Sequence, residues 1–192
     1  MNSIYPIILS VPEEKKTLTG RDRVLHLSKY ARDALELSAK KSFINLGNPL
    51  KDEKGVPMPV NGNYWSISHK PKYVAGVAAR SRIGIDIEEI RECRESLFRK
   101  IADQNEWELT NTDKNALFFR YWTSKESVLK AVGTGLKDLS KCKITQIIDE
   151  NNLAIDYMDK RWLIEHIFFN GHIASVIKDF LNIKWTVLKN QL

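Results

Sequence analysis

The stretch IGIDIE, residues 83–88, alternates between isoleucine and residues that are either glycine or acidic. Successive side chains of a β-strand point to opposite faces, so Gly84, Asp86 and Glu88 share one face and the two carboxylates lie about 7 Å apart. Carboxylates at this spacing can share a hard cation such as Mg²⁺. A solvated strand face could show the same alternation, but Gly84 favours the close approach of a ligand or a backbone. The stretch therefore predicts a strand with a candidate metal site.

A long helix is predicted downstream, over residues 113–132, with glycines at its end. At about 100° per residue, Lys125 and Glu126 fall among the aromatic and aliphatic side chains rather than on the opposite, polar arc. An exposed pair of Glu126 and Lys130 would only support the helix. On an inward face, however, an unpaired charge costs several kcal/mol, so these groups need a counter-charge or a ligand.

These residues together suggest a site for phosphates. Glu126 can add a third carboxylate to the strand pair, and Lys125 and Lys130 supply the positive charge that phosphates require. A basic segment without acids, residues 69–82, points the same way, although basic hairpin turns that keep a surface soluble would look similar. His69 directly follows a predicted strand end, where functional side chains are often found.

Working outward, strand and helix patterns alternate along the chain. Each of two halves runs from a strand through helices to predicted hairpins, which in the first half turn at residues 69–72 and 80–82, and this order favours an α+β fold. We expect two similar subdomains, residues 1–82 and 83–192, related by a pseudo-twofold axis, each with a small antiparallel sheet packed on helices. Further strands are predicted over residues 4–11, 64–68, 73–79, 143–148, 162–169, 172–177 and 183–188; helices begin at residue 20 and within 94–109; residues 45–63 form a loop.

Composition narrows the function classes. The 192 residues include 43% hydrophobic ones, which excludes intrinsic disorder, and 30 basic against 24 acidic residues give a net charge of +6. This excess indicates an anionic partner: nucleic acid, a phosphorylated small molecule or an acidic protein. Two isolated cysteines support neither a disulfide framework nor a cysteine-rich zinc site. The apolar N-terminus is interpreted as a strand and not a signal peptide, and no apolar run is long enough for a membrane span, so we expect a soluble, cytoplasmic protein.

Four motifs together resemble the 4′-phosphopantetheinyl transferase superfamily, in its longer, monomeric, surfactin-synthetase-activating class. They are GVPMP (55–59), SISH (66–69), IGIDIE (83–88) and WTSKESVLK (122–130). About forty residues separate Asp86 from Glu126, as in that family, and the resemblance extends over about residues 30–135. One departure is Val56, where many relatives carry a lysine for coenzyme A; Lys54 lies nearby.

The resemblance implies transfer of the phosphopantetheine arm of coenzyme A to a serine of an apo carrier protein, with release of adenosine 3′,5′-bisphosphate. It implies Mg²⁺, with Mn²⁺ as an alternative, on Asp86, Glu88 and Glu126. Glu126 would also act as the base on the carrier serine, and Lys130 would stabilise the departing phosphate. Contacts with coenzyme A are implied for Ser68, His69, Lys125, Lys130 and Arg32, and an auxiliary proton-transfer role for Glu106.

The implied partners are coenzyme A and an acidic acyl or peptidyl carrier of fatty-acid, polyketide or nonribosomal-peptide synthesis, with no nucleic acid and no membrane. The implied protein is a monomer with its site between the two halves. Two alternatives stay open. A metal-dependent nuclease also uses acidic residues with a Glu and Lys pair, but two residues apart on a strand, and a nucleic-acid-binding module would need a basic helix or an exposed aromatic platform.

Overall fold

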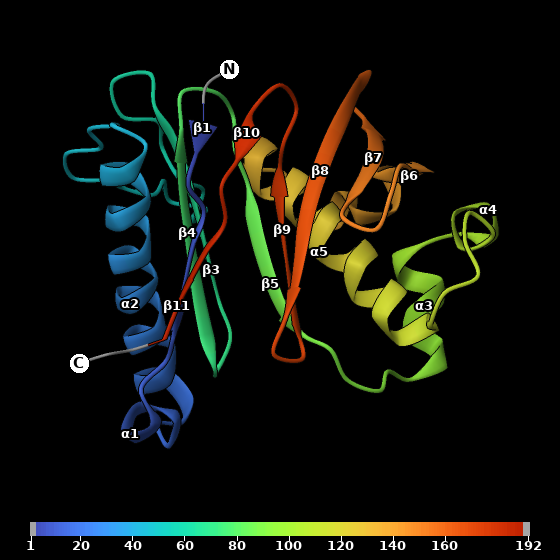
Figure 1. The fold of residues 1–192 in the computed structure, drawn as a ribbon, viewed down its shortest axis with the longest axis horizontal. Coiled ribbons are helices and arrows are strands. Elements are labelled where there is room, and N and C mark those ends of the chain that lie inside the picture. The colour runs from blue at the N-terminus through green and yellow to red at the C-terminus, as the bar shows by residue number, and fades with distance from the viewer. Residues whose placement is uncertain (1–2, 190–192) are drawn as a thin grey trace.

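The structure, a computed structural model, describes residues 3–189. A four-stranded and a five-stranded sheet face each other, with α2 on the outer side of the first and α5 on the outer side of the second (Figure 1). The helices are α1 Glu13–Lys16, α2 Gly20–Lys41, α3 Glu95–Ile101, α4 Gln104–Trp107, α5 Lys114–Val132 and the 3₁₀ helix η1 Leu136–Lys141. The strands are β1 Ser3–Ile4, β2 Ile7–Ser10, β3 Tyr64–His69, β4 Tyr73–Ala79, β5 Ile85–Glu89, β6 Lys143–Ile147, β7 Asn152–Tyr157, β8 Lys160–Phe169, β9 His172–Ile177, β10 Asn182–Ile183 and β11 Thr186–Leu188.

The four-stranded sheet has the order β11-β2-β4-β3 and packs α2 on its outer face. Alternation along β2 divides its side chains: Ile7 and Leu9 join the core under α2, whereas Ile8 joins the core between the sheets. Gly76 in β4 lets the helix come close, because a Cβ there would lie 2.3 Å from the backbone nitrogen of Leu35. The predicted hairpin between β3 and β4 is confirmed.

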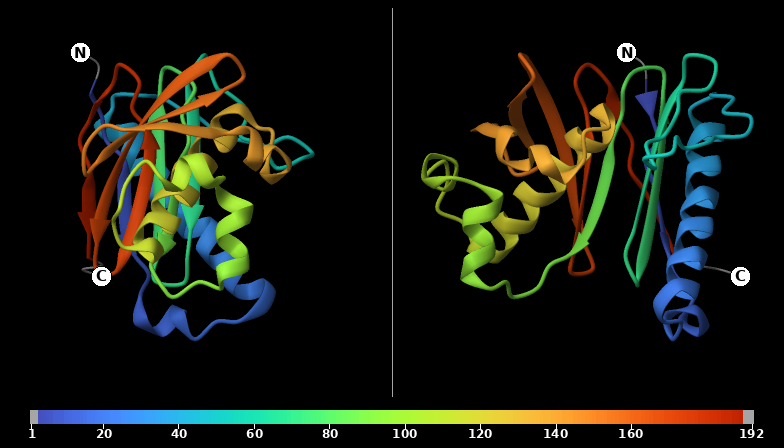
Figure 2. Two further views of the ribbon diagram at one scale, coloured as in Figure 1. Left: turned by 90° about the vertical axis from the view of Figure 1, so that its right-hand side faces the viewer. Right: turned by 180° about the vertical axis from the view of Figure 1, so that it is seen from behind.

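The five-stranded sheet has the order β5-β9-β8-β7-β6, with every neighbouring pair antiparallel. The prediction of a hairpin at residues 80–82 is wrong. Strand β5 pairs with β9, Asp86 opposite Ser175, so residues 80–84 carry the chain from one sheet to the other. Figure 2 shows this crossing from two further sides, with β5 between β3 and α5 in the rear view.

The α+β class, with antiparallel pairs and helices packed on sheets, is confirmed. Strand β7 was not predicted. The strand pattern at residues 183–188 splits into β10 and β11, which pair in parallel with β1 and β2. The last strands of the chain therefore complete the sheet built by its first residues, and the two-subdomain division at residue 82 stays a prediction. Within the described part of the chain, no helix has the length and hydropathy to cross a membrane.

Gly84 is required where β5 meets α5, and this gives a first prediction. A Cβ at Gly84 would lie 1.8 Å from the carbonyl oxygen of Ser127, so neither backbone can stay in place. Gly84→Ala should lower the free energy of unfolding by about 3 kcal/mol or more through overpacking. Urea denaturation measures this, with Ser81→Ala in the same crossing segment as the control. An unchanged midpoint for Gly84→Ala would contradict the close packing.

His166 on β8 gives a prediction for pH. Its side chain is buried, with Nε2 2.8 Å from the carbonyl oxygen of Glu150. Burial, and then the positive charge of Arg120, lower the pKa of His166 to about 3. In the unfolded chain this histidine takes up a proton near pH 6.5, whereas in the native chain it stays neutral down to a much lower pH. The free energy of unfolding is therefore highest above pH 6.5 and falls as the pH drops below that value.

The loss attributable to His166 should reach about 2 kcal/mol at pH 5. Chemical denaturation at several pH values measures it, and His166→Gln should make the pH profile shallower by that amount. Parallel profiles for the two proteins would show that His166 is not buried in its neutral form.

Candidate active site

Strand β5 presents Asp86 and Glu88 to α5, and both are buried, with exposed fractions of 4% and 9%. They therefore do not lie on a solvated strand face. The predicted close approach at Gly84 is confirmed as an approach of backbone, because α5 packs directly on it. Helix α5 begins after Asp113, whose side chain accepts a hydrogen bond from the backbone nitrogen of Ala116 at 2.7 Å, and ends at Gly133. Between these caps, α5 packs on β5 and places Glu126 within reach of the charges of Asp86 and Glu88.

Asp86 lies at the centre of the cluster. Its Oδ1 accepts hydrogen bonds from Ser68 Oγ and from Lys130 Nζ, each at 2.7 Å. Lys130 also donates to the carbonyl oxygen of Ile85 at 3.1 Å. The other oxygen, Oδ2, is buried and has no hydrogen-bond partner among the described residues. Such an atom is costly unless a ligand takes it up.

Glu88 and Glu126 complete the carboxylate cluster. Lys70 Nζ lies 2.7 Å from Glu88 Oε1. Burial, and then the charge of Asp86, raise the pKa of Glu88 and of Glu126, and Glu88 adds to the effect on Glu126. Glu126 Oε1 is buried and has no hydrogen-bond partner within residues 3–189. Asp86 therefore disfavours the charge of both glutamates, and two lysines lie beside these carboxylates.

The donor set of this cluster fits a hard cation. Mg²⁺ prefers oxygen ligands, and two buried carboxylate oxygens, Asp86 Oδ2 and Glu126 Oε1, are without partners. Among residues 3–189, however, no three acidic, histidine or cysteine side chains stand together as a group that could hold a metal ion. Lys130 pairs with Oδ1 of Asp86 and Lys70 with Oε1 of Glu88.

Positive charge gathers beside the carboxylates. Partial burial, and then the charges of Lys130, Lys70 and Lys51, lower the pKa of His69. The pKa of Lys51 is lowered in turn by burial and by the charges of Arg32 and Lys130. Sequence analysis missed Lys51, because it is one lysine in a loop with no motif around it. Only the fold of the loop, where Lys51 bridges to Pro57, brings it near the site.

The loop at residues 45–63 is anchored at several points. Arg32 Nη1 donates to the carbonyl oxygen of Pro49 at 2.9 Å, and its guanidinium lies 5.6 Å from the centre of the Trp65 ring. The Trp65 indole donates to the carbonyl oxygen of Met58 at 3.0 Å. Arg32 is therefore both a part of the basic group and a support for the loop.

Val56, the departure from the family motif, packs at the end of α5. A Cβ on Gly133 would lie 2.8 Å from Val56 Cγ1. The valine side chain thus lies against the backbone at the helix end, so the loop meets α5 there through an apolar group.

Lys125 and Glu106 do not lie in the carboxylate cluster. The Lys125 side chain is fully buried, with Nζ 2.5 Å from Glu106 Oε1 and 2.6 Å from the carbonyl oxygen of Ile101. Glu106 Oε1 also accepts from the backbone nitrogen of Ile144 at 3.0 Å. This buried pair joins α4 and β6 to α5, one residue before Glu126. None of these contacts exposes either group to a ligand, so the roles predicted for Lys125 and Glu106 gain no support from them.

The rest of α5 is buried on both arcs, where the sequence indicated one inward face. The hydroxyl-bearing arc packs on β9, with Thr123 Oγ1 2.6 Å from Ser175 Oγ. The aromatic arc packs toward α3, and the ring centres of Phe118 and Phe98 are 5.2 Å apart.

The segment that carries Glu126 and Lys130 lies on the helix α5. The nuclease alternative would need its Glu and Lys pair on a strand, so this position speaks against it.

Comparison with known proteins agrees with the motifs. The chain is 35% identical over 112 residues to the 4′-phosphopantetheinyl transferase HetI of Nostoc sp., covering 55% of this chain and 46% of that protein. It is 32% identical over 90 residues to the 4′-phosphopantetheinyl transferase gsp of Aneurinibacillus migulanus, covering 45% and 38%. The matches thus span less than half the length of either relative. A family model described as the 4′-phosphopantetheinyl transferase superfamily matches residues 82–177, which include β5 and α5. The chain belongs to the 4′-phosphopantetheinyl transferase superfamily.

Proposed function

We propose that the chain transfers the 4′-phosphopantetheine arm of coenzyme A to a serine of an apo carrier protein and releases adenosine 3′,5′-bisphosphate. The observation that carries this proposal is the carboxylate cluster, in which the buried oxygens Asp86 Oδ2 and Glu126 Oε1 have no hydrogen-bond partner in the described part of the chain and lysines pair with Asp86 and Glu88. Family membership and the names of both relatives support it.

Asp86, Glu88 and Glu126 would hold Mg²⁺, or Mn²⁺ in its place. When bound, the ion supplies charge stabilisation to the oxygens of the pyrophosphate. Lys130 and Lys70, now paired with two of the carboxylates, would then be free to turn their ammonium groups toward phosphate oxygens.

The basic group beside the cluster would bind the remaining phosphates of coenzyme A. The charge of Arg32 on α2 lowers the pKa of Lys51 in the loop, and the charge of Lys51 lowers the pKa of His69 on β3. Ser68 holds Asp86 in place through its 2.7 Å hydrogen bond. Preorganised cations of this kind stabilise the charge that develops on the leaving bisphosphate.

Glu126 would act as the base. The serine oxygen of the carrier attacks the phosphorus that bears the pantetheine arm, and its proton passes to the Glu126 carboxylate. The bond from that phosphorus to the bridging oxygen breaks, and the electron pair leaves on the adenosine bisphosphate, where Lys130 balances the charge.

The partner proposal is an acidic carrier that meets a protein of net charge +6. Because this attraction is between opposite charges, the affinity for the carrier should fall as the ionic strength rises.

We also propose that the protein acts in the cytoplasm and as a single chain.

The test is to incubate the chain with coenzyme A, Mg²⁺ and a panel of apo carriers from the three biosynthetic classes, and to weigh each carrier by mass spectrometry. We expect a gain of one phosphopantetheine arm on the serine, and no gain with EDTA or with a serine-to-alanine carrier. Carriers that all stay unmodified would overturn the proposal.

A further inference from the structure

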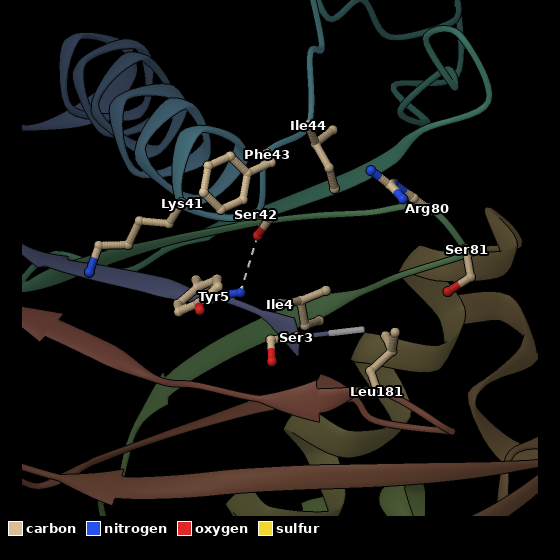
Figure 3. Close-up of a pocket in the computed structure, with 10 residues that line it drawn as sticks. All are labelled: Ser3, Ile4, Tyr5, Lys41, Ser42, Phe43, Ile44, Arg80, Ser81 and Leu181. Carbon is tan, nitrogen blue, oxygen red and sulfur yellow. Dashed lines mark hydrogen bonds between the residues drawn. The ribbon is translucent and has the colours of Figure 1, made fainter. Parts of the chain in front are cut away.

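A pocket of about 410 Å³ lies at the end of α2 and shares no residue with the carboxylate cluster. Figure 3 shows Lys41, Ser42 and Phe43 where α2 ends, Arg80 across from Phe43, and Leu181 from the other half of the chain. Its size suits a small ligand. The residues that line it are Ser3, Ile4, Tyr5, Lys41, Ser42, Phe43, Ile44, Arg80, Ser81 and Leu181.

The charge of the pocket is positive. Lys41 and Arg80 line it, no acidic residue does, and neither cation forms an ion pair within residues 3–189. A third cation, Lys184, lies 5.6 Å from the centre of the Tyr5 ring, which Lys41 approaches to 6.0 Å. Serine hydroxyls at three points of the wall can donate to an anion. The pocket therefore favours a negatively charged group.

Backbone carbonyl groups at the end of a helix repel an anion, but here three of them already accept hydrogen bonds, which weakens that repulsion. The backbone nitrogens of Ser42, Phe43 and Ile44 donate to the carbonyls of Ser38, Lys40 and Ala39, at 2.9, 3.2 and 2.9 Å. The last two bonds form a Schellman motif in which Phe43 takes the position usually held by glycine.

Phe43 is costly to the fold in this position. Its φ is 54°, in the left-handed region that a bulky side chain disfavours, and its side chain is 88% exposed. Neither backbone preference nor core packing explains a phenylalanine here. An exposed ring at the edge of a basic pocket is instead suited to contact a ligand.

We propose that this pocket binds a small molecule in which an anionic group, phosphate or carboxylate, is joined to a flat apolar body. Arg80 and the neighbouring Ser81 take the anionic group, while the Lys41 ammonium group, which extends away from Arg80 in Figure 3, only adds to the positive charge of the pocket. The body lies on Ile4 and Leu181 and against the Phe43 ring. This site is independent of the proposed transfer reaction.

The probe is phenyl phosphate, with benzoate as the carboxylate form, titrated into the isotopically labelled chain without added metal. We expect saturable shifts at the backbone amides of the pocket, weaker ones with inorganic phosphate, and none with phenol. Arg80→Gln should lower the affinity for phenyl phosphate about tenfold, because it removes a charged hydrogen-bond donor. The matched control is Arg82→Gln, which removes the same charge two residues away and outside the pocket wall.

Phe43→Gly separates binding from folding. This variant should lower the affinity for phenyl phosphate about threefold. It should also raise the midpoint of thermal unfolding by about 2–4 °C, because glycine relieves the backbone strain. Met158→Gly is the control, since Met158 also combines a positive φ of 52° with 63% exposure but lies in the β7–β8 turn; it should leave binding unchanged. No saturable shift with either probe, or equal affinity in wild type and both pocket variants, would overturn the proposal.

Discussion

Glu126→Gln is expected to lower the rate of phosphopantetheine transfer by about 10²–10⁴-fold, the usual contribution of a general base. Glutamine keeps the size of the side chain but cannot accept the proton of the carrier serine, and it removes one of the three carboxylates that we propose as metal ligands. Transfer is measured from the rate at which holo carrier accumulates at saturating coenzyme A and Mg²⁺.

The fold should tolerate this change, and stability should even rise. Burial and the neighbouring carboxylates raise the pKa of Glu126, so its charge opposes folding at neutral pH, and a neutral amide removes that cost. Thermal unfolding of the metal-free protein measures this. Glu108→Gln, an exposed acid at the end of α4, is the control for both measurements. Wild-type transfer by Glu126→Gln would show that Glu126 is neither base nor essential ligand.

Lys125→Met is expected to lower the free energy of unfolding by about 3–5 kcal/mol, because it leaves the buried Glu106 carboxylate without its partner. Both side chains are almost fully buried, and their pair connects α4 and β6 to α5. Chemical denaturation measures the loss. Adding Glu106→Gln to Lys125→Met should recover part of it, since the uncompensated charge is then gone.

Lys160→Met provides the comparison, because Lys160 pairs with Asp179 at the surface at 2.7 Å and its loss should cost at most about 1 kcal/mol. The same variants separate two roles for Lys125. A wild-type stability together with a raised KM for coenzyme A would mean that Lys125 contacts the substrate and that the buried pair is not its main role.

The elements that build the site could be predicted because each carries a strong local signal. The alternation of IGIDIE gave β5, and the span from the Asp113 cap to Gly133 gave α5. The motifs predicted that Asp86, Glu88 and Glu126 belong to one site, and the burial of Asp86 and Glu88 follows from how closely Gly84 lets α5 approach.

Other features depend on contacts distant in sequence, which no local pattern encodes. The pairing of β11 with β2 joins residues almost 180 positions apart. The short gap at residues 80–82 is typical of a hairpin, and only the pairing of β5 with β9 shows that the chain crosses to the other sheet there. Lys125 shows the same limit: its position on the helix indicated a buried charge, but not that Glu106 would be its partner. Lys51 has no sequence signal at all.

The most direct test of the carboxylate cluster is a crystal structure of the chain grown with coenzyme A and Mn²⁺, with anomalous diffraction used to locate the metal. We predict an anomalous peak for a manganese ion that is bound by Asp86, Glu88 and Glu126 and contacts the pyrophosphate. In the same structure, Lys130 should have moved from Asp86 to a phosphate oxygen. A peak elsewhere, or coenzyme A bound while Lys130 and Lys70 keep their present partners, would contradict the account.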